Sequence, residues 1–356
     1  MRIFYDYQAF IDVYSGASKS IVEVAKILSK NVELDFGCLV TNNYYLNEFK
    51  KNQFKPFSPN FDFKGKHRLE TQINQLYSTK KIINSKFDVL HVTGELYYFK
   101  SILKKPYVIT IHDMIPENFL KDKKRIQNRR ELINHSTRII AVSNNTKKEL
   151  LELYPNISED KIDVIYHGFN SEKIVYKKIN YESYILFVGK RGLYKNFFFT
   201  LNSILPLLNE NKEINFICTG NAFTEEEKQF IQKNNLNGRV FAIAADEITL
   251  NSLYRNALVF IYPSLYEGFG IPILEAFGNH CPIAISNSSC FPEIAGNAAE
   301  YFNPNDSDSI LQSISKIIFD KNYADNLKAK GDIQLKKYSW NTSASEHEKV
   351  YKKILG

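Results

Sequence analysis

The sequence predicts an α/β protein made of two doubly wound parallel sheets, one in each of two domains that face one another across a cleft. The chain has 356 residues, of which 44% are hydrophobic, and is long enough to bury two cores. In each half, short apolar runs of strand length alternate with longer segments of helical periodicity, which is typical of parallel sheets. Residues 167–183 lose this periodicity, as expected for a linker.

The first half opens with a strand, a turn and a helix. Residues 1–7 are predicted as the strand, Gly16 lies in a turn of small residues, and residues 21–28 have apolar positions at helical spacing. The turn has one glycine where the dinucleotide-binding fingerprint has three, which disfavours a nicotinamide-dependent enzyme. Further strands are predicted at residues 33–39, 89–92, 107–111, 138–142 and 162–166.

The predicted strand 107–111 ends in a polar pair, His112 and Asp113. Folds of this class bind ligands in the crevice beyond the carboxyl ends of their strands. His112 is therefore a candidate to hydrogen-bond a sugar hydroxyl or a phosphate, and a structural histidine is the alternative.

The second half repeats the alternation of strands and helices. Two acidic clusters there are interpreted as helix starts: residues 306–308 precede a helix at 310–318, and residues 225–227 follow Thr224. A metal-binding role for the triplet 306–308 is rejected on this ground. Strands are predicted at residues 184–188, 214–218, 239–242, 258–262 and 282–285, and a terminal helix at 344–354.

Two cations follow the first strand of the second half. Arg191 and Lys195 come soon after Gly189, so both can stand at the carboxyl end of that strand. A diphosphate requires such charge, with arginine making a two-pronged contact and lysine acting as a point charge. Ordinary surface cations are the alternative interpretation.

Residues 258–296 combine a buried strand, a glycine-bearing loop and a helix start, with Pro272 suited to the first helical position. A glycine loop that leads into a helix offers free backbone N–H groups and the positive end of a helix dipole to a phosphate. Two carboxylates, Glu267 and Glu275, lie eight residues apart in this unit. Ionised carboxylates accept hydrogen bonds from sugar or ribose hydroxyls. The combination suggests a nucleotide sugar.

Charge and composition bear on location and partners. Residues 1–170 hold 26 Lys and Arg against 19 Asp and Glu, which accounts for the whole net charge of +7. Aromatic residues and lysines interleave over 44–57, 97–107 and 119–130, which leaves open an anionic membrane surface, nucleic acid or a solvated lysine-rich face. The N-terminus lacks a signal peptide and the four cysteines have no zinc spacing, so we expect a cytoplasmic protein with reduced thiols.

At residues 263–276, PSLYEGFGIPILEA, the sequence resembles the E-x7-E signature of the retaining GT-B glycosyltransferases called group 1, or family 4. Weaker matches extend the resemblance over nearly the whole chain, at Gly16 and at residues 111–116, 141–143, 165–168, 189–196, 292–296 and 339–340. The resemblance implies a Rossmann-like acceptor domain at 1–168, a linker at 169–183, a Rossmann-like nucleotide-sugar domain at 184–338, and a helix at 339–356 that crosses back to the first domain.

The resemblance also implies roles for the candidate residues. In such enzymes the position of Glu275 binds the nucleotide ribose, and that of Glu267 contacts the donor sugar. Arg191 and Lys195 correspond to the pair that neutralises the diphosphate, with His112 near the reacting carbon. The resemblance implies that Gly270 and Ile271 bind the donor through their backbone amides. It also places Phe269, Gly189 and Gly16 at positions that contribute to donor binding. His280 stands where members commonly have glycine.

The predicted reaction is transfer of a hexosyl unit, with retained anomeric configuration, from a GDP-mannose-type or UDP-sugar donor to a glycan hydroxyl. The resemblance and the basic first half suggest a lipid-linked acceptor in bacterial O-antigen or capsule synthesis, at the inner face of the cytoplasmic membrane. No metal or other cofactor and no nucleic acid is expected. The alternatives are a GT-B nucleotide-sugar epimerase and a non-catalytic module that binds carbohydrate or membrane.

Overall fold

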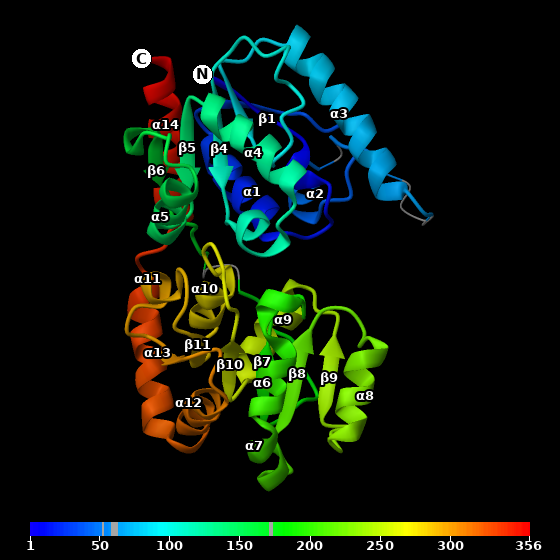
Figure 1. The fold of residues 1–356 in the computed structure, drawn as a ribbon, viewed down its shortest axis with the longest axis vertical. Coiled ribbons are helices and arrows are strands. Elements are labelled where there is room, and N and C mark those ends of the chain that lie inside the picture. The colour runs from blue at the N-terminus through cyan, green and yellow to red at the C-terminus, as the bar shows by residue number, and fades with distance from the viewer. Residues whose placement is uncertain (52, 58–62, 171–173) are drawn as a thin grey trace. The chain divides into compact units, whose positions relative to one another are not determined.

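A computed structural model shows two compact units, each built on a six-stranded sheet (Figure 1). The structure describes residues 1–51, 53–57, 63–170 and 174–356. The first unit consists of Met1–Gly168 with Trp340–Gly356, and the second of Phe169–Ser339. The predicted linker 169–183 includes residues 171–173, and the predicted basic segment 44–57 includes residue 52; these four residues lie outside the described part of the chain.

The sheet of the first unit is parallel throughout and has the strand order β2-β1-β3-β4-β5-β6. Its strands are β1 (Arg2–Tyr5), β2 (Glu33–Phe36), β3 (Val89–Val92), β4 (Tyr107–Ile111), β5 (Arg138–Ala141) and β6 (Ile162–Val164). Its helices are α1 (Gly16–Leu28), α2 (Tyr44–Phe49), α3 (Lys66–Asn84), α4 (Lys123–His135), α5 (Asn144–Leu153) and α14 (Trp340–Leu355).

Helices α1 and α14 share one core, although the ends of the chain supply them. Ser15 caps α1 by accepting a hydrogen bond from the Ser18 amide at 3.0 Å. Both helices contribute buried apolar side chains to the cluster around β1. The Tyr351 hydroxyl of α14 shares hydrogen bonds with the Tyr5 hydroxyl (2.9 Å) and with His91 Nδ1 (2.6 Å). The terminal helix is therefore an internal part of the first unit.

The second sheet is also parallel throughout and has the order β12-β11-β10-β7-β8-β9. Its strands are β7 (Tyr184–Phe187), β8 (Asn215–Thr219), β9 (Val240–Ile243), β10 (Val259–Tyr262), β11 (Ile283–Ser286) and β12 (Glu300–Phe302). Its helices are α6 (Phe197–Ser203), α7 (Leu205–Glu210), α8 (Glu225–Lys233), α9 (Glu247–Asn256), α10 (Ile271–Gly278), α11 (Phe291–Ala295), α12 (Ser307–Phe319) and α13 (Lys321–Leu335).

The structure confirms the two α/β sheets and corrects several details of the prediction. Helix α1 begins at Gly16, which was predicted to lie in a turn before a helix at 21–28. The edge strand β12 was not predicted, because it has three residues and only Phe302 is buried. Helix α10 begins at Ile271, so Pro272 takes the second helical position instead of the first. Helix α14 begins at Trp340, four residues before the start predicted from the sequence pattern and one residue after the start implied by the family resemblance.

The acidic clusters begin helices, as predicted. Asp306 accepts hydrogen bonds from the amides of Asp308 (3.0 Å) and Ser309 (3.2 Å), and Thr224 and Glu227 form a capping box at the start of α8. All four cysteines are buried free thiols. Within the described ranges, no helix combines the length and apolar character needed to cross a membrane.

Candidate functional site

The strand order of the second sheet reverses between β7 and β10. Strands β8 and β9 continue on one side of this point, and β11 and β12 on the other. In open parallel sheets, ligands bind at such a switch point beyond the carboxyl ends of the strands. Lys195 follows β7, Glu267 follows β10, and the structure joins them in an ion pair. The two loops are also tied by a hydrogen bond of 2.8 Å from the Leu265 amide to the Tyr194 carbonyl.

The Lys195–Glu267 pair is held by its surroundings. The side chains are 12% and 13% exposed, and Lys195 Nζ lies 5.3 Å from the centre of the Tyr262 ring. The Glu267 amide donates to Ser289 Oγ at 3.1 Å, and the Cys290 thiol donates to the Glu267 carbonyl at 3.2 Å. Burial and the Glu267 carboxylate raise the pKa of the Tyr262 hydroxyl, which therefore stays neutral.

Arg191, the second predicted cation, is bound to a carboxylate that the sequence analysis did not include in the site. Its Nε and Nη2 donate to Glu227 of α8 at 2.6 and 3.2 Å, and the two side chains are 8% and 5% exposed. Nη2 also donates to the carbonyls of Asn221 (2.8 Å) and Ala222 (3.1 Å). Burial acts most strongly and would raise the pKa of Glu227, but the hydrogen bonds from Arg191 and Thr224 and the charge of Arg191 together outweigh it, so that pKa is lowered.

Glycines shape both loops of this edge. Gly270 has φ +88°, and a Cβ there would lie 3.1 Å from Ile273 Cδ1 and from Phe291 Cε1. It caps α10, in which Pro272 has no N–H and the Ile273 amide donates to the Gly270 carbonyl at 2.9 Å, so the Ile271 amide is the one at the helix start without an intrahelical acceptor. Gly189 has φ +124°, and its amide donates to Thr219 Oγ1 at 3.1 Å.

Two further predicted positions of the second unit, Glu275 and Phe269, differ in exposure. Glu275 is partly buried, and its Oε2 accepts a hydrogen bond of 3.3 Å from the Tyr254 hydroxyl. Phe269 is 4% exposed and its ring meets Tyr338 edge-on, with 5.9 Å between centroids. The Phe269 side chain therefore supports the glycine loop from within, and Glu275 is the one that solvent reaches.

In the first unit, His112 follows β4 and is neutral at pH 7. Burial, with the nearby charge of Arg129, lowers the pKa of His112 to about 4. Its Nε2 is buried and has no hydrogen-bond partner among the described residues. The ring stacks on His167, with 5.8 Å between centroids. An unpaired ring nitrogen at the end of a parallel strand is well suited to a polar ligand group.

Arg129 supports the turn after His112, a role that was not predicted from the sequence. The segment 119–130 was interpreted as a basic surface, but the Arg129 side chain is 2% exposed. Its Nη1 lies 3.0 Å from Glu95 and 3.3 Å from Glu117, and its Nη2 donates to the Asp113 carbonyl. No local pattern marks this arginine as buried, because both carboxylates come from other segments.

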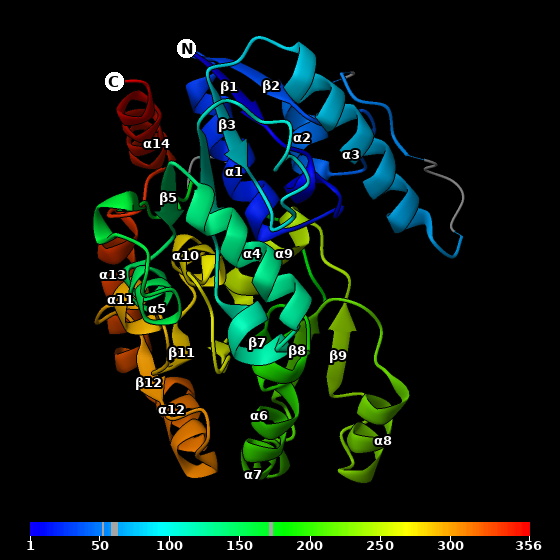
Figure 2. The same ribbon diagram turned by 45° about the horizontal axis from the view of Figure 1, so that its top comes forward.

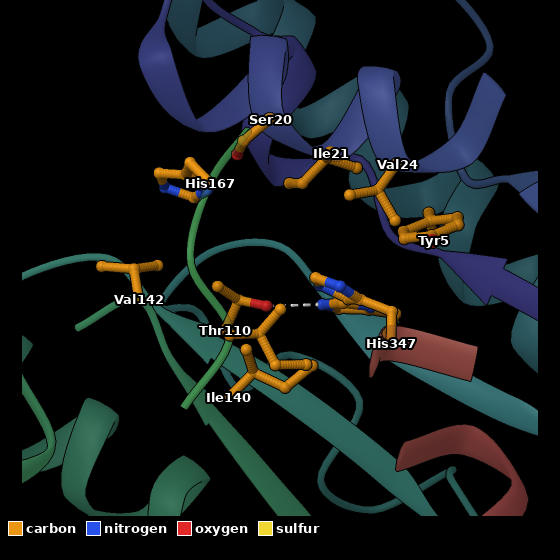
Figure 3. Close-up of a pocket in the computed structure, with 11 residues that line it drawn as sticks. Tyr5, Ser20, Ile21, Val24, Thr110, Ile140, Val142, His167 and His347 are labelled. Carbon is orange, nitrogen blue, oxygen red and sulfur yellow. Dashed lines mark hydrogen bonds between the residues drawn. The ribbon is translucent and has the colours of Figure 1, made fainter. Parts of the chain in front are cut away.

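A small cavity of about 10 Å³ lies in the first unit, lined by histidines and apolar residues (Figure 3). It has room for about one water molecule. His91 Nε2 and Thr110 Oγ1 share a hydrogen bond of 2.8 Å. Burial lowers the pKa of His91, His167 and His347. Helix α1, which Gly16 opens, contributes Ser20, Ile21 and Val24 to the lining. Gly16 itself is not among the lining residues.

The first sheet also has a switch point, between β1 and β3. Side chains of the first unit occupy this point. Asp6 is fully buried and accepts hydrogen bonds from the Thr93 amide (2.8 Å) and from Gln8 Nε2 (2.6 Å). A Cβ on Gly94 would lie 2.5 Å from the Gln8 side chain. The edge next to Asp6 is therefore closed by internal hydrogen bonds, and His112 marks the more accessible part of this unit.

Family models match both units of the chain. Residues 14–173 match the model of Glycosyltransferase Family 4, and residues 169–333 match that of Glycosyl transferases group 1. The chain belongs to the group 1 glycosyltransferases.

Known relatives of this glycosyltransferase include two enzymes of O-antigen chains. It is 29% identical to O-antigen chain mannosyltransferase B of Escherichia coli over 281 residues, which cover 73% of each chain. It is 27% identical to O-antigen chain mannosyltransferase RfbU of Salmonella typhimurium over 222 residues, 60% of this chain and 62% of that one.

The solved structure of Anabaena Alr3699/HepE in complex with UDP and glucose has a similar fold. It has a TM-score of 0.78 and 15% identity, and the match covers 99% of this chain and 100% of that one. At this identity the likeness concerns the fold alone, and the predicted GT-B class is confirmed.

Proposed function

We propose that this glycosyltransferase moves a hexosyl unit from a nucleoside diphosphate sugar to a glycan hydroxyl, with retained anomeric configuration. The observation that carries the proposal is the Lys195–Glu267 pair at the switch point of the second sheet, beside the N-terminus of α10. A lysine, a carboxylate and free helix amides are the groups that a diphosphate linked to a sugar requires.

The donor sugar we favour is mannose from a GDP donor. The two relatives above are named mannosyltransferases, which supports mannose. UDP sugars are the second choice, because the Anabaena structure holds UDP and glucose. The acceptor we propose is a lipid-linked glycan of bacterial O-antigen or capsule synthesis, met at the inner face of the cytoplasmic membrane.

The charged candidate residues, His112 and the amides of the glycine loop each take a defined part in this proposal. Lys195 faces the diphosphate, because an ammonium has three donors and Glu267 takes one of them. Arg191 can offer Nη1, which among the described residues has only a long contact of 4.0 Å to Cys218 Sγ. The amides of Gly270 and Ile271 add partial positive charge.

Glu267 and His112 would contact the donor sugar, and Glu275 the ribose. The neutral His112 ring suits a hydroxyl contact, since one ring nitrogen accepts and the other donates. We include no metal in the proposal, because the two cations and the helix amides supply positive charge to the leaving group.

The chemical task is to stabilise an oxocarbenium-like centre and a departing diphosphate. Charges held in place before the reaction stabilise the leaving group without further reorganisation. We propose that the departing phosphate assists the acceptor on the same face of the sugar. Glu267 and Glu275 then bind hydroxyls and do not act as the acid and nucleophile of a retaining glycosidase.

A thermal-shift panel of GDP-mannose and the UDP, ADP and dTDP sugars tests the donor. The correct donor at one hundred times its dissociation constant should stabilise the protein by about 2.7 kcal/mol. Incubation with that donor, with and without a glycan acceptor, then tests the reaction. A new nucleotide sugar formed without acceptor would indicate an epimerase. If no donor stabilises the protein and none is turned over, the protein would be a non-catalytic module.

A further inference from the structure

Helix α3 of the first unit exposes apolar side chains and buries polar ones. Leu69, Leu76 and Ile83 are 43%, 73% and 59% exposed. On the buried side lie Glu70, Asn74, Ser78 and Ile82, three of which are polar. At about 100° per residue, the exposed apolar stripe and the buried row project from opposite sides of the helix.

Specific hydrogen bonds fix this orientation. Asn74 Oδ1 accepts from the amides of Leu39 (2.8 Å) and Val40 (3.1 Å), and Asn74 Nδ2 donates to the Val40 carbonyl at 2.9 Å. Ser78 Oγ and the Tyr98 hydroxyl share a hydrogen bond of 2.6 Å. Rotating α3 to bury its leucines would break these bonds and leave partly buried backbone groups of Leu39 and Val40 unpaired. The apolar stripe is thus a fixed part of the surface.

Basic residues border the stripe. Arg68 and Lys80 are exposed, and at about 100° per residue they project on either flank of Leu69, Leu76 and Ile83. The one acidic residue of the helix, Glu70, is on the buried side. In Figure 1 and in Figure 2, α3 runs along the outer edge of the first unit. The exposed side of the helix therefore combines apolar and positive character.

We propose that α3 docks this protein on an anionic lipid bilayer. Leu69, Leu76 and Ile83 would enter the boundary between headgroups and acyl chains, while Arg68 and Lys80 meet lipid phosphates. The charges favour this occupant over a second copy of the chain, because pairing two such helices would bring like charges together. The inference deepens the proposed lipid-linked acceptor by naming the surface that reaches the membrane, and it does not depend on the donor.

Flotation with vesicles tests the proposal without donor or acceptor. The whole protein should float with phosphatidylcholine vesicles that contain phosphatidylglycerol, and less as salt is raised. Leu76→Gln should lower partitioning at least about tenfold, and Arg68→Gln or Lys80→Gln about fivefold each. Ile333→Gln is the matched control, since Ile333 is an exposed isoleucine (65%) on α13 of the second unit, and should bind as wild type.

Three results would overturn the proposal. The first is flotation of Leu76→Gln equal to that of the wild type. The second is wild-type binding to purely phosphatidylcholine vesicles equal to its binding to vesicles with phosphatidylglycerol. The third is a dimer in light scattering that Leu76→Gln dissociates, which would assign the stripe to a second copy of the chain. Transfer to a water-soluble acceptor is measured separately, so failure of the proposed transferase reaction and failure of membrane docking give different results.

Discussion

Lys195 and Glu267 form an ion pair although 72 residues separate them in the sequence. The pair exists because β7 and β10 are adjacent strands, so their following loops meet at one edge of the sheet. Both side chains are largely withdrawn from solvent, and removing one leaves the charge of the other without its partner. Substitutions at either position therefore change the electrostatics of both.

Lys195→Ala should lower kcat by about 10²–10³-fold at saturating donor, comparable to removing one donor of an oxyanion hole. The reason is the loss of a fixed positive charge where the diphosphate departs. Lys190→Ala is the control, since Lys190 is an exposed lysine of the same loop and should retain full turnover. Unchanged kcat in Lys195→Ala would remove this residue from the proposed mechanism.

Glu227→Gln should destabilise the second unit by about 3–5 kcal/mol, because it leaves the buried Arg191 charge unpaired. Urea unfolding measures the effect. Glu226→Gln, at an exposed neighbour on the same helix, should change stability by less than about 0.5 kcal/mol. The double variant Arg191→Met, Glu227→Gln should recover part of the loss; if it is no more stable than Glu227→Gln, the pairing is not the cause.

Acid should destabilise the first unit through its buried histidines. Burial lowers the pKa of His112 and of His347 to about 4, below the ordinary value of 6.5. Between these values the unfolded chain binds more protons, so the free energy of unfolding should fall as pH falls from about 6.5 to about 4 and be fully present above that range. Urea midpoints over this range measure the slope.

His347→Gln should flatten that slope, because one of the histidines that must stay neutral is gone. His67→Gln, at an exposed histidine of α3, is the control and should leave the slope unchanged. Asp6 and Glu70 have pKa values raised by burial and act in the opposite direction, so the comparison between variants is the decisive one. Equal slopes in His347→Gln and wild type would contradict the assignment.

His280 has φ +53°, a left-handed conformation that favours glycine. Its Nδ1 lies 2.9 Å from Asp332 Oδ1, and both side chains are about half exposed. His280→Gly and His280→Ala both lose this contact, so their difference reports the backbone alone. The glycine variant should be more stable than the alanine variant by about 1 kcal/mol in urea unfolding.

Strands were predicted well where both faces are buried. The predicted bounds of β3 and β4 match the structure, because Val89–Val92 and Tyr107–Ile111 are continuous runs with every residue buried. The pairing of Arg129 with Glu95 and of Arg191 with Glu227 was not predicted. These partners lie 34 and 36 residues apart, and periodicity shows which side of an element is buried but not which charges meet.

The loops that carry the candidate site residues could be predicted from the ends of the strands. The exposure of apolar side chains on α3, and the burial of its polar ones, could not be predicted from the sequence. Lys195 and Glu267 lie in the loops that follow β7 and β10, and adjacent parallel strands bring such loops together. Asn74, by contrast, is buried because it satisfies the backbone of Leu39 and Val40, a need that depends on tertiary contacts. Sequence pattern alone places leucines inward, and here the hydrogen bonds of the core decide otherwise.

The packing of α14 on α1 determines when the first unit can complete its core during synthesis. The second unit is one continuous segment, Phe169–Ser339, whereas the first needs Trp340–Gly356 to complete its core. During translation, residues 1–168 emerge before Tyr351, the partner of Tyr5 and His91, so their core stays incomplete until α14 has been made. The first unit therefore finishes folding after the second, although most of it is made earlier, and loss of the segment around Tyr351 would damage a unit whose other residues precede Phe169.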